Sequence, residues 1–219
     1  MTLPIITVVG AGPGVGLAVA RRFGREGYRV ALVARRPEAL DEYVAELERA
    51  SIEAAGFAAD AADESSIRQA FAAIRERWGA TEVLVYNAAV LKQGRPSEIP
   101  AADLVYDFRV NVVGAVIAMQ EVVADMRKSR RGTILLTGGG LALSPMAPMA
   151  SLSIGKAGIR SLAQSMGAEL EVDGIHVATV TICGMVKPGS HFDPDRIADA
   201  YWTLHTQEPG KREREVMYR

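Results

Sequence analysis

Four glycines lie close together near the start of the chain, in the run G-A-G-P-G-V-G from Gly10 to Gly16. The apolar segment I-I-T-V-V precedes this run, and a segment with the period of an amphipathic helix begins at Val15. In a strand–turn–helix unit, Gly10 permits the tight turn, Gly14 lets a diphosphate approach the backbone, and Gly16 lets the helix pack closely on the strand. The helix N-terminus then faces the anion. The run therefore predicts the first βα unit of a dinucleotide-binding domain, and the alternative is a tight turn without a ligand.

Apolar runs alternate with helix-period segments along the chain. The expected strands are Ile5–Gly10, Tyr28–Ala34, Ala54–Ala59, Glu82–Asn87, Gly132–Gly138, Ile175–Ile182 and Glu215–Tyr218. The expected helices are Val15–Glu26, Pro37–Ala50, Glu64–Trp78, 101–126, 150–172 and Pro194–Thr206. Several strands are apolar throughout, as parallel strands covered on both faces are. We therefore predict one α/β domain over residues 1–219, a Rossmann-like, doubly wound parallel sheet of about seven strands with helices on both faces.

Composition limits the class of protein further. At 219 residues and 49% hydrophobic, the chain is long enough for one large core. A net charge of −1 without a long single-sign block argues against a nucleic-acid or membrane partner. A lone cysteine, Cys183, and an opening with no room for a signal peptide predict a soluble cytoplasmic protein. The three histidines are dispersed, so we expect no metal site, and His176 is expected at the surface of its strand.

The second expected strand ends in V-A-R-R-P, from Val33 to Pro37. A site selective for NAD places a carboxylate here to accept hydrogen bonds from the ribose 2′-hydroxyl. Ala34 offers none, whereas the guanidinium groups of Arg35 and Arg36 suit a 2′-phosphate through charge-assisted contacts. We therefore expect NADP(H) to be preferred over NAD(H). The alternative is that both arginines only solvate a helix start, an end where cations are disfavoured.

From residue 5 to about residue 185 the chain resembles the short-chain dehydrogenase/reductase family. The spacing of Gly10, Gly14 and Gly16 matches that family's glycine fingerprint. Asp60, in F-A-A-D, matches an aspartate that binds the adenine amine. Asn87, in N-A-A, resembles the asparagine of the N-A-G motif, which lies beside the adenosine ribose and braces the sheet.

The resemblance also implies residues at the reactive end. Asn111, in R-V-N-V-V-G, matches an asparagine that holds a water in the family's proton relay. Lys156, in S-I-G-K-A-G-I, matches the lysine that contacts the nicotinamide ribose and lowers the pKa of the catalytic tyrosine. The expected nucleotide-binding residues are Gly10, Gly12, Pro13, Gly14, Val15, Gly16, Arg35, Arg36, Asp60, Ala61, Asn87, Ala88, Ala89, Lys156, Gly184 and Val186.

The chain departs from the family pattern at the reactive end. The tyrosine of Tyr-x-x-x-Lys falls on Leu152, and the serine that precedes it falls on Gly139. The Pro-Gly pair after the sixth strand is Cys-Gly here, ending at Gly184. Neither Leu152 nor Gly139 has a side chain that can donate a proton, and a positioned general acid contributes roughly 10² to 10⁴-fold.

Other residues are candidates for the missing donor. We expect Asn111, Lys156 and Ser153 to form the catalytic set, with Lys156 able to donate a proton if burial lowers its pKa. The alternative role for Ser153 is to satisfy backbone groups at a helix start. Tyr106 and His191 are weaker candidates for entering the pocket.

Two hypotheses for function follow. The first is an NADP(H)-dependent oxidoreductase of the short-chain dehydrogenase/reductase type, acting on a small carbonyl or alcohol through a non-standard active site. The second is a catalytically silent NADP-binding module with a regulatory or scaffolding role. The segment at about 184–210 is expected to form a short substrate lid. By resemblance, helices 101–126 and 150–172 pair in a homodimer or homotetramer.

Overall fold

A computed structural model describes residues 3–219 of the protein. These residues form one sheet of seven strands in the order β3-β2-β1-β4-β5-β6-β7, and every neighbouring pair is parallel. The predicted doubly wound parallel sheet is therefore confirmed. The strands are β1 (Ile5–Val9), β2 (Arg29–Ala34), β3 (Ala54–Ala58), β4 (Val83–Tyr86), β5 (Gly132–Gly139), β6 (Ile175–Ile182) and β7 (Glu215–Tyr218).

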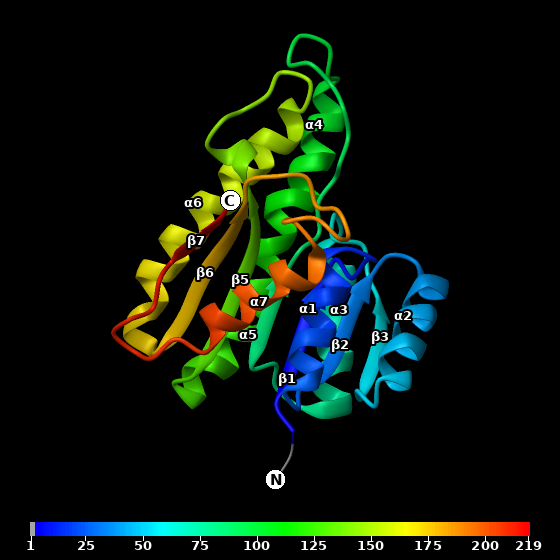
Figure 1. The fold of residues 1–219 in the computed structure, drawn as a ribbon, viewed down its shortest axis with the longest axis vertical. Coiled ribbons are helices and arrows are strands. Elements are labelled where there is room, and N and C mark those ends of the chain that lie inside the picture. Colours follow the sequence, from blue (N-terminus) through cyan, green and yellow to red (C-terminus); the bar gives the residue numbers. More distant parts are fainter. Residues whose placement is uncertain (1–2) are drawn as a thin grey trace.

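Helices cover both faces of the sheet (Figure 1). The main helices are α1 (Val15–Arg25), α2 (Pro37–Arg49), α3 (Glu64–Trp78), α4 (Ala101–Phe108), α5 (Gly114–Ser129), α6 (Ala150–Leu170) and α7 (Pro194–His205). One core cluster joins α1, α2 and α7 to the sheet, and a second joins α3, α5 and α6 to the opposite face. The strand order reverses between β1 and β4, so the carboxyl ends of these two strands form the switch point where such folds bind ligands.

The expected helix 101–126 is wrong as a single element. The chain forms α4, then a π-helical turn over Arg109–Val113, and then α5, which continues to Ser129. The π-helical turn is hydrogen-bonded to the sheet, because the Tyr86 hydroxyl in β4 donates to the carbonyl of Val110. Gly114 follows, and a Cβ there would lie 2.4 Å from the same Tyr86 oxygen. Such π-turns are frequent at functional sites.

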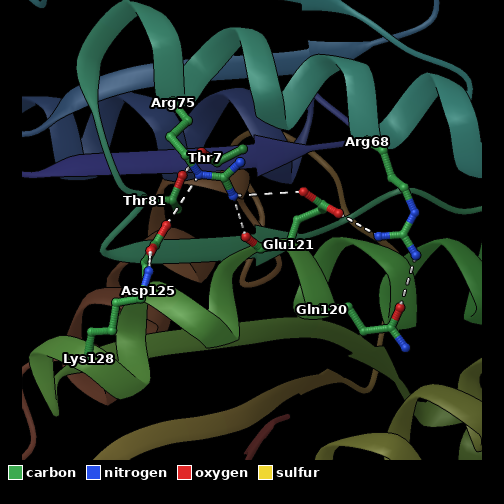
Figure 2. Close-up of polar contacts among 8 residues, drawn as sticks. All are labelled: Thr7, Arg68, Arg75, Thr81, Gln120, Glu121, Asp125 and Lys128. Carbon is green, nitrogen blue, oxygen red and sulfur yellow. Dashed lines mark hydrogen bonds and ion pairs between the residues drawn. The ribbon is translucent and has the colours of Figure 1, made fainter.

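Ion pairs connect α5 to α3, and both helices cover the same face of the sheet. Figure 2 shows Arg68 and Arg75 of α3 reaching towards Glu121 and Asp125 of α5. Arg75 also donates to the main-chain carbonyl of Glu121 at 2.8 Å. These contacts hold in place the helix that continues from the π-turn.

The interior differs from the sequence expectation at His176. This residue is 4% exposed, not on the surface, because β7 adds to the sheet beyond β6. Its Nε2 atom lies 2.8 Å from the carbonyl of Glu213, in the segment that leads into β7. Within residues 3–219, the helices are all too short or too polar to cross a membrane.

Candidate functional site

A cavity of about 430 Å³ lies at the carboxyl ends of β1 to β4. Its walls come from the loops that follow these strands and from α4. The cavity is lined by a set of residues that includes Gly10, Arg35, Arg36, Asp60, Ala61, Asn87, Ala88 and Ala89. The other predicted nucleotide-binding residues, Gly12, Pro13, Gly14, Val15, Gly16, Lys156, Gly184 and Val186, do not line it.

The glycine turn is shaped by close approach on one side and by open space on the other. Gly10 has φ +87°, and a Cβ there would lie 2.3 Å from the amide nitrogen of Ala88. A Cβ on Gly16 would lie 2.7 Å from the Gly10 carbonyl oxygen, so neither position accepts a side chain without rearrangement. Gly12 and Gly14 have nothing within 4 Å of a Cβ position.

The first amides of α1 are available to an anion. Within the described chain, the backbone nitrogens of Gly14, Val15 and Gly16 donate to no carbonyl or side chain. Unpaired amides at a helix start carry the positive end of the helix dipole, and they commonly bind phosphate. The open space at Gly12 and Gly14 leaves room for such a group.

Two exposed arginines and a tyrosine stand at the β2 side of the cavity. Arg35 and Arg36 follow the last residue of β2 and make no ion pair within residues 3–219. The hydroxyl of Tyr106, in α4, lies 3.4 Å from Nη1 of Arg35 and also lines the cavity. The structure thus places Tyr106 beside Arg35 in the wall of the cavity.

Asp60 and Asn87 are both fixed by backbone contacts. Asp60 accepts a hydrogen bond from the amide of Ala62 at 2.9 Å, and its own amide donates to Ser66 at 3.0 Å. Asn87 donates from Nδ2 to the carbonyl of Gly10 at 2.9 Å, which ties the end of β4 to the glycine turn.

Asn111 sits inside the π-turn and is 3% exposed. Its Oδ1 atom accepts a hydrogen bond from the amide of Val90 at 2.7 Å. Its Nδ2 atom is buried and has no hydrogen-bond partner among the described residues. Because a buried donor without an acceptor costs free energy, this amide is suited to binding a polar group, as the resemblance implies.

Lys156 lies on α6 with its ammonium against β5. Its Nζ atom donates to the carbonyl of Thr137 at 2.6 Å. Burial lowers the pKa of Lys156 from 10.5 to about 8. The side chain runs alongside Gly139, where a Cβ would lie 3.4 Å from the Lys156 Cγ atom, an ordinary van der Waals distance.

Leu152 and Ser153, which lie four and three positions before Lys156 on the same helix, offer no free proton. Leu152 is 6% exposed and purely aliphatic. The hydroxyl of Ser153 donates to the carbonyl of Met149 at 2.9 Å and accepts from the amide of Met146 at 3.3 Å. Ser153 is therefore occupied at the helix start, which agrees with the structural alternative considered for it.

The loop after β6 is held by the C-terminal residues. Gly184 is exposed, and a Cβ there would lie 2.2 Å from the ring of Phe192. His191 has its Nε2 atom 2.5 Å from the carbonyl of Arg219, and Tyr218 donates to the His191 carbonyl at 3.0 Å. His191 is thus hydrogen-bonded to the end of the chain.

Sequence reasoning missed Thr137, which contacts both ends of the site. Its hydroxyl lies 2.9 Å from Asn87 Oδ1 and 2.7 Å from the hydroxyl of Tyr201, while its carbonyl accepts from Lys156. The available signal was a polar residue ending the apolar run T-I-L-L-T at the carboxyl edge. Its partner Tyr201, in α7, belongs to no motif and gave no signal.

Comparisons with known proteins agree with this fold. The profile of the short chain dehydrogenase family matches residues 4–193. The chain is 31% identical over 206 residues to 2,3-dihydro-2,3-dihydroxybenzoate dehydrogenase of Bacillus subtilis, which covers 94% of this chain and 75% of that protein. It is 32% identical over 211 residues to the sorbitol dehydrogenase of Cereibacter sphaeroides, covering 95% and 79%. The crystal structure of a metagenomic short-chain oxidoreductase in complex with NADP superposes with a TM-score of 0.90, at 29% identity, covering 99% and 96%.

A parallel sheet with a glycine turn at its switch point defines a Rossmann-like protein. The family match extends over most of the chain, and the relatives named above are oxidoreductases. The chain belongs to the short-chain dehydrogenase family.

Proposed function

We propose that the protein binds NADP(H) in the cavity at the switch point and acts as an oxidoreductase on a small carbonyl or alcohol. The observations that carry this proposal are the cavity, which Gly10, Arg35 and Arg36 line, and the free amides at the start of α1, which follow Gly10 in the glycine turn. The metagenomic relative in complex with NADP supports the choice of nucleotide. When bound, the cofactor supplies or accepts the hydride.

The residues present fit the nucleotide. The amides at the start of α1, beside Gly12 and Gly14, would hold the diphosphate. Arg35 and Arg36 would hold the 2′-phosphate, because β2 ends in Ala34 and not in a carboxylate that would favour an unphosphorylated ribose. Asp60 would accept from the adenine amine.

The proton in this scheme is held at Nζ of Lys156. Burial lowers the pKa of Lys156 to about 8, so the group is still protonated at neutral pH and is a stronger acid than an exposed lysine. In carbonyl reduction, Lys156 would transfer this proton to the oxygen of the nascent alcohol and would be reprotonated from solvent. Asn111 would orient a polar group through its unpaired Nδ2 atom.

A silent NADP-binding module is the second candidate function, and one observation favours it. At the two positions where the family pattern expects a tyrosine and a serine, the chain has the buried aliphatic Leu152 and the side-chain-free Gly139. Without those donors, a loss of roughly 10² to 10⁴-fold in rate is expected.

The Leu152→Tyr, Gly139→Ser double variant separates the two functions. The structure accepts a Cβ at Gly139, which would meet Lys156 only at 3.4 Å or more. An active enzyme reduces at least one carbonyl of a broad panel with NADPH as it stands, and Lys156→Met abolishes this activity. A silent module binds NADPH but turns over only in the double variant. Calorimetry that shows no binding heat with NADPH or NADH contradicts both candidate functions, the enzyme and the silent module.

We also infer that α4, α5 and α6 form a contact between copies of the chain. Apolar side chains on this part of the protein are exposed, among them Val105 (54%), Phe108 (39%) and Ile154 (45%). Exposed apolar patches of this kind mark interaction surfaces. Light scattering on an Ile154→Asp variant tests the inference, since a lower mass than wild type is expected.

A further inference from the structure

The Thr137 hydroxyl has two side-chain hydrogen-bond neighbours, the Asn87 amide and the Tyr201 hydroxyl, and the direction of each hydrogen bond is determined by its partner. The carbonyl of Gly10 can only accept, so the Asn87 atom facing it at 2.9 Å is the Nδ2 donor. The Asn87 Oδ1 atom therefore faces Thr137 and accepts its hydroxyl proton at 2.9 Å. Tyr201 must then donate to the Thr137 Oγ1 atom, 2.7 Å away.

The result is one chain of donors from α7 to the glycine turn. It runs from Tyr201 to Thr137, to Asn87 and to the Gly10 carbonyl. Tyr201 is fully buried and Thr137 is 8% exposed, so water does not readily replace either partner. A buried polar group that loses its partner carries the full desolvation cost, and a satisfied network of this kind orients its members.

The same threonine reaches the reactive end through its main chain. Its carbonyl accepts from the Lys156 ammonium at 2.6 Å. Thr137 is therefore one residue with contacts to the glycine turn, to the lysine and to the C-terminal helix.

We propose that Thr137 and Tyr201 are positioning residues, which hold Asn87 and through it the Gly10 turn in the conformation that receives the nucleotide. The part of this inference that concerns nucleotide affinity rests on the proposed function. The part that concerns the conformation of the turn does not.

Two variants and two matched controls test the proposal. Thr137→Val and Tyr201→Phe break the chain of donors. Thr179→Val is the control for the first, because Thr179 is also fully buried and donates at 3.0 Å to the Leu136 carbonyl without touching Asn87. Tyr28→Phe is the control for the second, because the Tyr28 hydroxyl contacts His205, near the other end of α7, at 2.7 Å.

The first readout needs no nucleotide. In ¹⁵N–¹H spectra of the unliganded protein, Thr137→Val and Tyr201→Phe are expected to shift the amide resonances of Gly10, Gly12, Gly14 and Gly16, and Thr137→Ser is expected to restore them. The two controls should leave these resonances in place. If neither breaking variant moves the glycine amides more than its control does, the proposal is wrong.

The second readout is the dissociation constant for NADPH. Thr137→Val is expected to raise it about five- to tenfold, the equivalent of one net hydrogen bond, and Tyr201→Phe by somewhat less. The controls Thr179→Val and Tyr28→Phe, at equal thermal stability, should have the wild-type dissociation constant for NADPH. If Thr137→Val fails to fold, Tyr201→Phe and Thr137→Ser still decide the question. If wild type binds no NADPH, the proposed function fails, and the amide shifts alone decide this inference.

Discussion

The Lys156 ammonium and the Thr137 carbonyl are 2.6 Å apart, and this contact joins α6 to the carboxyl end of β5. The Thr137 carbonyl is a strong hydrogen-bond acceptor for the ammonium. The ammonium is otherwise buried and has little contact with solvent. Burial prevails, so the pKa of Lys156 falls from 10.5 to about 8.

We predict that Lys156 titrates near pH 8. The signal of a ¹³C-methylated Lys156 should change at that pH, well before that of Lys92, whose pKa Asp103 raises by accepting its hydrogen bond. Reductase activity should fall as the pH rises through this value, because the proton on Nζ is lost. Titration of Lys156 together with or after Lys92 would contradict the prediction.

The same shift has a consequence for stability. Between about pH 8 and 10.5 the unfolded chain keeps the Lys156 proton while the folded protein has released it. The free energy of unfolding therefore gains a positive slope with pH in this interval. In Lys156→Met this contribution to the slope should vanish in denaturant titrations run across the interval.

Arg35 and Arg36 are predicted to set the preference for the phosphorylated coenzyme. Replacing both by alanine removes charge-assisted hydrogen bonds to a 2′-phosphate, so NADPH affinity should fall about ten- to a hundredfold. NADH affinity should not change, because NADH has no phosphate there. Calorimetry with both coenzymes measures the effect, with the exposed Arg25→Ala as the control on α1. An equal loss for NADH and NADPH would show that the arginines act elsewhere.

Alanine substitutions at Gly12 and Gly16 are predicted to have different effects on nucleotide affinity and on the free energy of unfolding. A Cβ at Gly12 meets nothing within 4 Å, so Gly12→Ala should leave the free energy of unfolding within about 0.5 kcal/mol of wild type. It should nonetheless weaken NADPH binding about tenfold or more, because the methyl group occupies the space beside the diphosphate.

Gly16→Ala should instead lower the stability of the fold. Its Cβ would lie 2.7 Å from the Gly10 carbonyl oxygen, so overpacking should cost about 1–3 kcal/mol of stability. Urea unfolding and NADPH titration of both variants check the pair. Loss of stability in Gly12→Ala with normal binding would refute the assignment of its open side to the ligand.

The fold was largely predictable because its signals are local. β6, β7 and α3 have the bounds expected from sequence, since each is an apolar or amphipathic run between clear turn signals. The glycine turn is equally local, because residues 5–25 carry the strand, the turn and the helix within one segment.

What the sequence could not reveal depends on contacts between distant residues. The π-turn at Val110 is linked to the Tyr86 hydroxyl, which lies 24 positions earlier. Thr137 meets Tyr201, 64 positions later, and Tyr106 reaches Arg35 across 71 positions. No periodicity or motif records such pairs, so the partner of Lys156 and the contact between Tyr106 and Arg35 became visible only in three dimensions.

Acid destabilisation is predicted from His205 at the end of α7. Its Nδ1 atom lies 2.9 Å from the Thr133 hydroxyl and its Nε2 atom 2.7 Å from the Tyr28 hydroxyl. Burial, with the nearby Arg131 adding to it, lowers the pKa of His205 from 6.5 to about 4. As the pH falls through this interval, the unfolded chain takes up a proton that the folded protein excludes, so the free energy of unfolding decreases, by on the order of 2–3 kcal/mol at most.

Urea unfolding of His205→Gln between pH 4 and 7 tests this. The variant should lose part of the acid-dependent slope, and the remainder belongs to other groups, including His176, whose pKa burial also lowers. His191→Gln is the control, because His191 is exposed and lies in the loop after β6. The control should keep the wild-type slope. Equal slopes in wild type and His205→Gln would contradict the prediction, because they would mean that His205 takes up its proton over the same pH range in the folded protein as in the unfolded chain.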